Sequence, residues 1–447
     1  MQLRLEDSLL QGVLVDHRDV GEIIFAIEKL SEQFRNGKVR LIRLSKYSKL
    51  QDIDSPVWYT IEKSGTLHNR TIVSSAKVFT SHYVGRCTID NVDISIVPRF
   101  FKGFVFRRIL SLACNVFIPE GSTSTAFGKD GSIWLLGLLW KAFVEKALTL
   151  GQIPKQYIGI HDNLRRFRGR LDIPRHIHAN LTDASKFFCT YRKLSMDNTI
   201  NRAIRVTYRL LCDNGLSGVM GDLAGYDKKL EAFGVSDSNV TARDLDGIAY
   251  SALNDIYKPA MNISRIILDR KGAGAESKGV QVSPAFFLDI AELWELYLLR
   301  VLQKNLEPDF SVYSPNAEGG SFLVDGSLRS VRPDILIEKN GVILMIIDAK
   351  YKHYEKLGST ANDGNAVSRE DLYQMCTYLY HYGTPGKTIT GVFTSPFCDA
   401  METHPLSSND AHRIGIVNLS VNGITDLSEM QSAEKKFIQN IRSLLKS

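Results

Sequence analysis

The stretch at residues 331–354, VRPDILIEKNGVILMIIDAKYKHY, constrains the fold of this chain more than any other. Two apolar runs flank Asn340-Gly341, a dipeptide typical of hairpin turns. The second run, residues 342–347, is too short to cross a membrane and is rich in β-branched residues. It indicates a strand that is buried on both faces, so the sequence predicts a β-hairpin with a buried second strand.

Charged residues stand at the ends of these two predicted strands. Asp348 and Lys350 are two positions apart, so their side chains point to the same face. Asp334 supplies a second carboxylate, and two facing carboxylates repel each other unless a divalent cation lies between them. Such a cation activates water for the hydrolysis of a phosphodiester, while a nearby lysine neutralises the phosphate or orients the water. We therefore predict a metal site here.

The form of the turn decides whether Asp334 and Asp348 share a face. A two-residue turn at Asn340-Gly341 pairs Asp334 with Ile347 and sends the two carboxylates to opposite faces. A three-residue loop with Gly341 in the left-handed region brings them to one face. We predict the three-residue loop.

Within residues 286–300 a helix is predicted to begin at Asp289, and it contributes a third carboxylate. Asp289 and Glu292 have the spacing of a capping box, which gives Glu292 a structural role at the helix start. Glu295 has apolar neighbours three and four positions away, so its carboxylate would be partly desolvated unless it meets a cation. This neighbourhood favours Glu295 as a metal ligand over the ordinary alternative, an exposed helical glutamate.

A second helix is predicted to begin at Ser368, where Ser368 and Asp371 form another capping box. Asp371, Gln374 and Tyr378 share one face of this helix by their three- and four-residue spacing. Gln374 would hold Lys350 or the scissile phosphate. The alternative is that the glutamine belongs to a polar helix surface.

The hydrophobic pattern divides the chain into three predicted domains and a multidomain fold of the α/β and α+β classes. Residues 1–130 carry short alternating runs and one early helix, which predicts a β-rich domain. Residues 131–270 change to a helical period and predict a mostly helical middle domain. Residues 280–447 predict a mixed sheet flanked by helices, with the charged site at strand ends. A stretch rich in Gly, Ala and Ser at 268–282 is the predicted linker.

Composition excludes several classes of protein. At 447 residues, with 44% hydrophobic and 23% charged residues, the chain is typical of soluble globular proteins of two or three domains. The six cysteines form no CxxC or Cys/His cluster in the sequence, so neither a zinc site nor a disulfide framework is suggested, and we expect a cytoplasmic protein. The most apolar segment, residues 133–150, contains Lys141, Glu145 and Lys146. It predicts an amphipathic helix and not a membrane span.

The densest basic patch is residues 165–175, with five arginines in a chain of net charge +6. Arginine forks bind phosphates, so a role in contacting the DNA backbone or a nucleotide is one interpretation. An inter-domain clamp on carboxylates is the other, and the sequence favours neither. The Gly-rich residues 272–279 lack the Gly-Lys-Ser/Thr order of a phosphate loop, and no nucleotide-hydrolysing motif occurs elsewhere in the sequence.

Several segments together resemble the McrC family, the nuclease subunit of McrBC-type and LlaJI-type restriction systems. Pro333-Asp334 followed by Asp348-Ala-Lys350 resembles the core of the PD-(D/E)xK nuclease superfamily. The resemblance covers roughly residues 130–400, and its order is more specific than any single motif. It rests on residues 168–173, 188–192, 197–202, 287–295, 332–337, 348–352 and 371–378.

The resemblance implies a Mg²⁺-dependent DNA endonuclease with a defined set of site residues. Asp334, Asp348, Lys350 and Gln374 would be catalytic, and Glu295 would bind the metal together with the two aspartates. The implied partners are DNA and an McrB-like AAA+ GTPase (or other NTPase) ring, with no membrane. The N-terminal domain would dock on the ring and stimulate its nucleotide hydrolysis.

Two other functions compete with this one. The first is a non-catalytic adaptor that docks on and stimulates an AAA+ ring, with the nuclease fold retained as a scaffold. The second is a free-standing nuclease of the RecB type. The intact set of three carboxylates, Lys350 and Gln374 favours the endonuclease.

Overall fold

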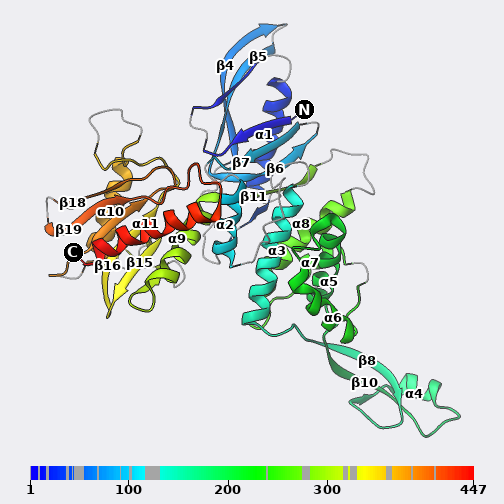
Figure 1. The fold of residues 1–447 in the computed structure, drawn as a ribbon. Helices are drawn as coiled ribbons and strands as arrows, with labels where there is room; N and C mark the ends of the chain where they lie inside the picture. The colour runs from blue at the N-terminus through cyan, green and yellow to red at the C-terminus, as the bar shows by residue number, and fades with distance from the viewer. Residues whose placement is uncertain are drawn as a thin grey trace. The chain divides into compact units, whose positions relative to one another are not determined.

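A computed structural model shows the protein as two compact units (Figure 1). Unit 1 contains Met1–Ser132 and Ser277–Ser447, and unit 2 contains Ile133–Glu276. Unit 1 thus contains both the N-terminal stretch (residues 1–130) and the C-terminal stretch (residues 280–447) that the sequence predicted as separate domains. It describes residues 2–8, 11–16, 20–36, 40–42, 44, 55–67, 70–90, 92–99, 103–115, 131–237, 240–273, 282–315, 321–322, 330–358, 365–383, 386–406 and 409–446. Most of the predicted linker, residues 274–281, lies outside these ranges.

A five-stranded sheet in unit 1 joins the two ends of the sequence. Its strand order is β1-β7-β6-β11-β3. β11 comes from the C-terminal stretch, yet it pairs antiparallel with β6 and parallel with β3. The strand that leads into helix α9 is therefore built into the N-terminal sheet. The bounds are β1 Gln2–Glu6, β3 Arg40–Ile42, β6 Tyr83–Ile89, β7 Val92–Val97 and β11 Val282–Asp289.

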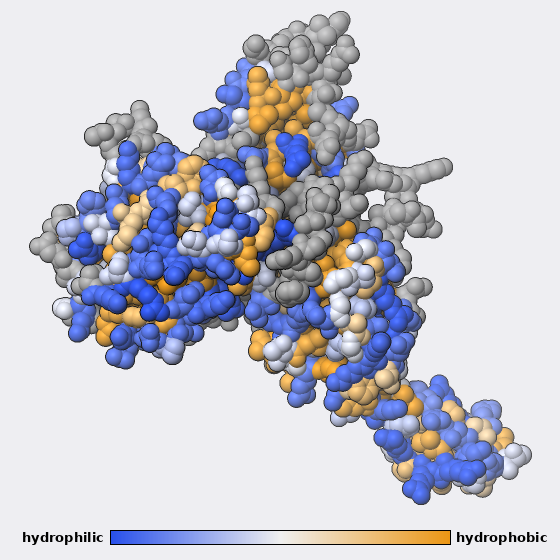
Figure 2. Space-filling view, viewed as in Figure 1, coloured by the Kyte–Doolittle hydropathy of each residue, from blue (hydrophilic) through white to orange (hydrophobic). Residues whose placement is uncertain are grey.

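The predicted β-rich character and early helix of the N-terminal region are both present. Helix α1, Val20–Arg35, buries Ile23, Ile27 and Leu30 in the core that it shares with the five-stranded sheet. A second sheet has the order β2-β5-β4 and exposes Leu14 and Trp58, and Figure 2 shows apolar surface over this region. The bounds are β2 Val13–Asp16, β4 Val57–Leu67, β5 Arg70–Thr80 and α2 Gly103–Cys114.

The C-terminal part of unit 1 is a mixed six-stranded sheet with the order β12-β15-β16-β17-β19-β18. β16 is an interior strand, antiparallel to β15 and parallel to β17. Met375 and Leu379 of α10 lie in one core cluster with Ile346 of β16 and Phe393 of β17, so α10 covers this face of the sheet. The strands are β12 Ser311–Tyr313, β15 Ile335–Lys339, β16 Val342–Ala349, β17 Thr390–Thr394, β18 Met401–Leu406 and β19 Asn409–Val417.

Helices complete this part of the unit, as the sequence predicted. The helix with Ser368 at its N-cap ends before Gly383, and the last helix begins at Leu427. Strand β18 was missed, because its sequence METHPL has no apolar alternation. The remaining elements are α9 Ile290–Leu306, α10 Arg369–Tyr382, α11 Leu427–Lys446, and the short pair β13 Ser321–Phe322 and β14 Ser330–Val331.

The predicted three-residue loop of the hairpin is wrong. Lys339 pairs with Val342, which leaves a two-residue turn in which Asn340 and Gly341 both have positive φ, 52° and 78°. A β-bulge between Ile337 and Glu338 then shifts the register by one residue, so that Ile335 faces Ile347. The two-residue turn alone would have put Asp334 and Asp348 on opposite faces. The shift brings them back to one face, because they form the next pair outward from Ile335 and Ile347.

Unit 2 combines its helices with a long hairpin that the sequence did not predict. β8 and β10 pair over nine residues, and Figure 1 shows them extending from the helices with α4 at the far end. The bounds are α3 Gly131–Leu150, β8 Gln156–Leu164, β9 Arg170–Leu171, α4 Ile173–Ala179, β10 Phe187–Ser195, α5 Thr199–Leu211, η1 Cys212–Leu216, η2 Gly221–Leu223, α6 Ala224–Ala232, α7 Ala242–Asp246, η3 Asp255–Tyr257 and α8 Lys258–Ala273.

The helix predicted to be amphipathic, α3, is instead buried on all sides along residues 135–142. Lys141 is only 1% exposed, and its ammonium group donates to the Val219 carbonyl (2.8 Å) and to Asp222 (2.6 Å). A buried lysine with such partners is compatible with a core position. No helix among the described residues is both long and apolar enough to span a membrane.

Candidate functional site

Asp334 and Asp348 lie at the same end of the β15–β16 hairpin. Asp334 directly precedes β15, and its Oδ2 accepts a hydrogen bond from the Ala349 N–H across the hairpin (2.7 Å). Asp348 is the penultimate residue of β16 and is only 2% exposed. The buried interior of β16 and the bulge therefore place two carboxylates together at the edge of the core.

Lys350 follows β16 and lies among anionic and polar groups. Its Nζ is 2.8 Å from Asp348 Oδ2 and 3.1 Å from Asp371 Oδ1. The same ammonium group donates a hydrogen bond to Gln374 Oε1 (3.1 Å). The sequence left two interpretations of Gln374, a contact with Lys350 or a place on a polar helix surface. The structure shows the contact with Lys350.

Gln374 is itself held by a short chain of hydrogen bonds. Its Nε2 donates to the Tyr378 hydroxyl (2.7 Å), which in turn donates to the Arg332 carbonyl (3.0 Å). Tyr378 is buried, and burial raises its pKa above the ordinary range, so its hydroxyl remains protonated. The orientation of the glutamine is thus fixed by a neutral hydroxyl, which accepts from Gln374 and connects α10 to the residue before Pro333.

Asp371 belongs to this site, although the sequence predicted for it only a helix cap and a face shared with Gln374 and Tyr378. The cap is present, since the Asp371 N–H donates to Ser368 Oγ (3.2 Å). Burial raises the pKa of Asp371, but hydrogen bonds from Tyr354 and Lys352 and the charge of Lys350 outweigh it and lower the pKa well below its usual range. The sequence signal that could have found this role was the face that Asp371 shares with Gln374.

Glu295 reaches the same electrostatic environment from α9. Burial raises its pKa well above the ordinary value, and the negative charge of Asp334 adds the next largest effect, with a further contribution from Asp348. The helix that carries it begins at Asp289, whose carboxylate accepts from the Ala291 and Glu292 N–H groups (3.0 and 3.1 Å). The three predicted metal ligands therefore act on one another.

The structural role predicted for Glu292 has an unexpected partner. Its carboxylate accepts a buried hydrogen bond from the Leu44 N–H (3.0 Å), 248 positions away in the sequence. This contact fastens the first turn of α9 to the N-terminal part of unit 1. It fixes the position of Glu295, which lies one turn further along the helix.

The charges of the site leave an excess of negative potential. Burial raises the pKa of Asp334 well above its ordinary value, and the nearby charge of Asp348 raises it further, despite the opposing effect of Lys350. Burial lowers the pKa of Lys350, but Asp348 and Asp334 outweigh it and raise the pKa above the ordinary value. Lys350 is therefore a permanent cation that does not fully neutralise its neighbours.

The residues present fit a hard divalent cation such as Mg²⁺. All candidate ligand atoms are carboxylate oxygens, the type that Mg²⁺ binds. Asp348 Oδ2 is buried and, although it is close to Lys350 Nζ, it has no aligned hydrogen bond from any group that the structure describes. Glu295, Asp334 and Asp348 could hold the ion, because a cation would remove the repulsion that adds to burial in raising the pKa of Glu295 and Asp334.

The arginine patch lies in unit 2, from the end of β8 through β9 into the first turn of α4. Arg165, Arg166, Arg168 and Arg170 are all exposed. Arg168 lies over the Tyr191 ring, with 4.4 Å between the guanidinium carbon and the ring centroid. Within the described residues, none of these four makes an ion pair with a carboxylate, whereas the fifth, Arg175, pairs with Asp172 (3.7 Å). Both interpretations of the patch, phosphate binding and an inter-domain clamp, stay predictions.

Comparisons with known proteins agree on one family. A family model described as "McrBC 5-methylcytosine restriction system component" matches residues 78–389. This range includes all five predicted site residues, from Glu295 to Gln374. No curated protein matches the chain.

Two solved structures from Thermococcus gammatolerans are similar to the chain. One is described as a "Refined half-complex from tetradecameric assembly of Thermococcus gammatolerans McrB AAA+ hexamers with bound McrC". The likeness has 18% identity and a TM-score of 0.54, and it covers 99% of this chain and 100% of that chain. The other is the "Cryo-EM structure of the Thermococcus gammatolerans McrBC complex". This likeness has 19% identity and a TM-score of 0.36, and it covers 68% of this chain and 88% of that chain. At this identity, the first likeness concerns the fold alone.

Proposed function

The chain belongs to the McrBC 5-methylcytosine restriction system component family, and we propose that it is the DNA-cleaving subunit of such a system, a metal-dependent endodeoxyribonuclease. One observation carries the proposal. Asp334, Asp348 and Lys350 lie together at one end of a buried hairpin, with Glu295 in the same electrostatic environment. Such an arrangement is typical of the PD-(D/E)xK nucleases that the sequence resembles.

Each residue has a separate role in this proposal. Glu295, Asp334 and Asp348 would hold Mg²⁺, which when bound supplies a Lewis acid and lowers the pKa of a water molecule. Lys350 stays protonated, so it stabilises the negative charge on the scissile phosphate and orients the attacking water. Gln374 is a positioning residue, because it contacts Lys350 (3.1 Å) and is itself fixed by Tyr378.

We propose DNA and an AAA+ ring as partners. The similar solved structure is described as McrB AAA+ hexamers with bound McrC. The sequence of this chain contains no phosphate loop, so a nucleotide-driven system would need a second subunit to hydrolyse GTP or ATP. The substrate would be foreign or modified DNA, and the reaction would be the hydrolysis of its phosphodiester bonds.

The decisive experiment combines the purified protein with its presumptive ring partner. Methylated and unmethylated DNA are incubated with the complex in the presence of Mg²⁺ and GTP or ATP, and cleavage is followed on gels. Asp348→Asn should lower the cleavage rate by at least about a hundredfold, because it removes one ligand charge from the metal site. Glu370→Gln changes an exposed carboxylate on α10 and should leave the rate unchanged.

Ring binding distinguishes the outcomes. The Asp348→Asn protein should still bind the ring and stimulate its nucleotide hydrolysis, because the substitution leaves the shape of the protein unchanged. Undiminished cutting by this variant would refute the site. If the unsubstituted protein stimulates the ring but cuts no DNA under any of these conditions, the non-catalytic adaptor is the correct function.

A further inference from the structure

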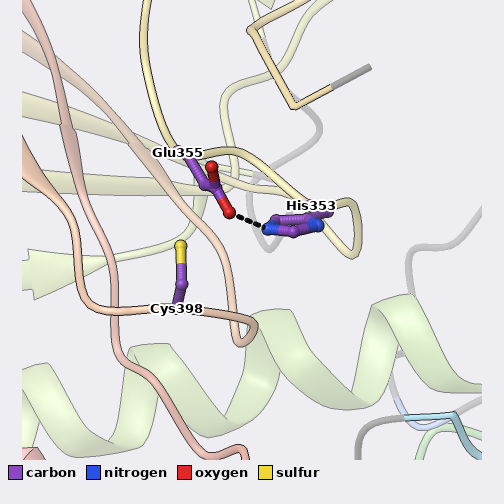
Figure 3. A group of neighbouring side chains, drawn as sticks. All are labelled: His353, Glu355 and Cys398. Atoms are coloured by element: carbon purple, nitrogen blue, oxygen red, sulfur yellow. Dashed lines mark hydrogen bonds and ion pairs between the residues drawn. The ribbon is translucent and has the colours of Figure 1, made fainter. Parts of the chain in front are cut away.

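Three side chains with donor atoms for a soft metal gather outside the proposed nuclease site. They are His353, Glu355 and Cys398, and one ligand atom from each lies within 4.8 Å of the others (Figure 3). We propose that this cluster, the HEC site, binds a divalent cation that prefers thiolate ligands. Zn²⁺ is the ion that we expect to bind there. No spacing in the sequence indicated this cluster, because Cys398 is distant from the other two residues along the chain.

The ligand atoms of the HEC site are near enough to one another to form a three-ligand zinc centre after a small adjustment. His353 Nε2 and Glu355 Oε1 are 2.6 Å apart, and Figure 3 shows the Cys398 sulfur turned toward this pair. In a tetrahedral zinc site, pairs of ligand atoms are separated by about 3.3 to 3.6 Å, given the usual Zn–N, Zn–O and Zn–S bond lengths. Small side-chain rotations that separate the first two atoms would admit the ion.

Buried hydrogen bonds hold the two segments of the HEC site in place. Asn418, which is 3% exposed, donates to the Tyr354 carbonyl (2.6 Å), and Tyr354 lies between His353 and Glu355 in the sequence. The same amide nitrogen is 3.6 Å from Cys398 Sγ, and Asn418 Oδ1 accepts from the Ser395 N–H (2.9 Å). One buried side chain thus connects both halves of the site, so little ordering would be needed when a metal binds.

The donor set selects among metals. A thiolate is a soft ligand that favours Zn²⁺ and disfavours Mg²⁺, whereas imidazole and carboxylate are also common zinc ligands. Three protein ligands leave one tetrahedral position for water or another ligand. His353 and Glu355 are partly exposed, with side-chain exposures of 25% and 44%, so an ion can enter from solvent. The HEC site is therefore chemically distinct from the all-carboxylate nuclease site.

Metal binding would join the segment after β16 to the segment after β17. His353 lies three residues after Lys350, and the two segments already touch, since Ser395 Oγ donates to the Lys352 carbonyl (2.6 Å). A bound ion would therefore restrict the motion of the segment after β16, which carries Lys350 and Lys352. This inference does not depend on the nuclease proposal, because it concerns a different set of ligands.

The full-length protein can be tested with Co²⁺ as a spectroscopic substitute for Zn²⁺. After reduction and removal of metals with a chelator, titration with Co²⁺ should produce the thiolate-to-Co²⁺ charge-transfer band and the visible bands of a tetrahedral site. One equivalent of Zn²⁺ should displace the cobalt and remove these bands. Zinc should also slow the reaction of Cys398 with a thiol reagent, followed by peptide mass spectrometry.

Variants separate the HEC site from other thiols and from the nuclease site. Cys398→Ser should abolish the charge-transfer band, and His353→Gln should weaken Zn²⁺ binding by at least about tenfold. Cys376→Ser, at a partly buried thiol on α10, and Asp348→Asn should both retain the band. Circular dichroism confirms that each variant is folded.

Two results would overturn the HEC site. The first is the absence of a charge-transfer band in the unsubstituted protein with excess Co²⁺, which would leave only a hydrogen-bonded His–Glu pair beside a thiol. The second is a band of full intensity in the folded Cys398→Ser protein, which would place the metal elsewhere.

Discussion

The buried carboxyl of Asp7 should make unit 1 less stable as the pH rises from about 5 to about 7.5. Asp7 is 0% exposed, and its Oδ1 accepts from the Arg99 N–H and lies 3.5 Å from the Tyr351 hydroxyl. Its Oδ2 is buried without a partner among the described groups. Burial raises the pKa of Asp7 from 3.8 to about 6, against the opposing effect of Arg99.

The sign and size of the effect follow from proton linkage. Because the folded pKa lies above the unfolded one, the stabilising contribution is fully present below pH 3.8 and is lost as the pH rises through about 6. Over the whole range the loss is about 3 kcal/mol. Between about pH 5 and 7.5 it is about 1.4 kcal/mol, or tenfold in the opening equilibrium.

Hydrogen exchange measured by mass spectrometry can isolate this contribution. Peptides that cover β1 and β7 report on the opening that exposes Asp7, because the Asp7 N–H donates to the Val97 carbonyl (3.0 Å). Comparison with Asp7→Asn at each pH cancels the intrinsic exchange rate and the titration of all other groups. The difference in opening free energy between the two proteins should change by about 1.4 kcal/mol between about pH 5 and 7.5.

A matched control uses a second aspartate in the same sheet. Asp90→Asn changes an exposed residue in the turn between β6 and β7, where asparagine tolerates the positive φ of 49° equally well. This variant should differ from the unsubstituted protein by the same amount at every pH. A pH-independent difference for Asp7→Asn as well would refute the assignment of a raised pKa to Asp7.

Three further predictions concern the site and its frame. Gln374→Ala should lower the DNA cleavage rate of the complex with its ring partner by about 10- to 100-fold, measured on gels, because a hydrogen bond to the charged Lys350 is lost. Glu292→Ala should lower the free energy of unfolding by about 1–3 kcal/mol in urea denaturation, because the buried Leu44 N–H loses its acceptor. Asn340→Ala should cost about 1 kcal/mol in the same measurement, because Asn340 has a φ of 52°, whereas Asn340→Gly should be nearly neutral.

Each of these has an outcome that contradicts it. Equal cleavage by Gln374→Ala and by Tyr373→Ala, a substitution at an exposed residue on α10, would show that the glutamine does not position the lysine. A Glu292→Ala protein no less stable than Glu370→Ala would remove the role of the buried contact. Equal stability of the alanine and glycine variants at Asn340 would contradict the positive-φ argument.

The β15–β16 hairpin shows which structural features a local sequence pattern can predict. The apolar runs on either side of Asn340-Gly341 predicted both strands, and the same face for Asp334 and Asp348 was also predicted. The predicted cause of this shared face, a three-residue loop, was wrong, however, because the register is set by a bulge between Ile337 and Glu338. A bulge depends on how the strand packs against its neighbours, so no short sequence pattern reveals it.

Side-chain periodicity also predicted parts of the site that are carried on helices. The spacing on α10 placed Gln374 on a common face with Tyr378, and the structure connects them directly (2.7 Å). The same spacing put Asp371 on that face, but the only role predicted for Asp371 was a helix cap, because a cap is decided by residues three positions apart. Its contacts with Lys350 and Lys352 need β16 and α10 to pack together first.

Local sequence alone therefore determined most of the elements around the candidate site and the types of charge at their ends. Tertiary structure decided which of those charges meet. β11 pairs with strands from the start of the chain, Glu292 binds Leu44 from 248 positions away, and Cys398 comes beside His353. Hydrophobic periodicity and capping act over a few residues, whereas these contacts arise only when distant segments bury their apolar faces against one another.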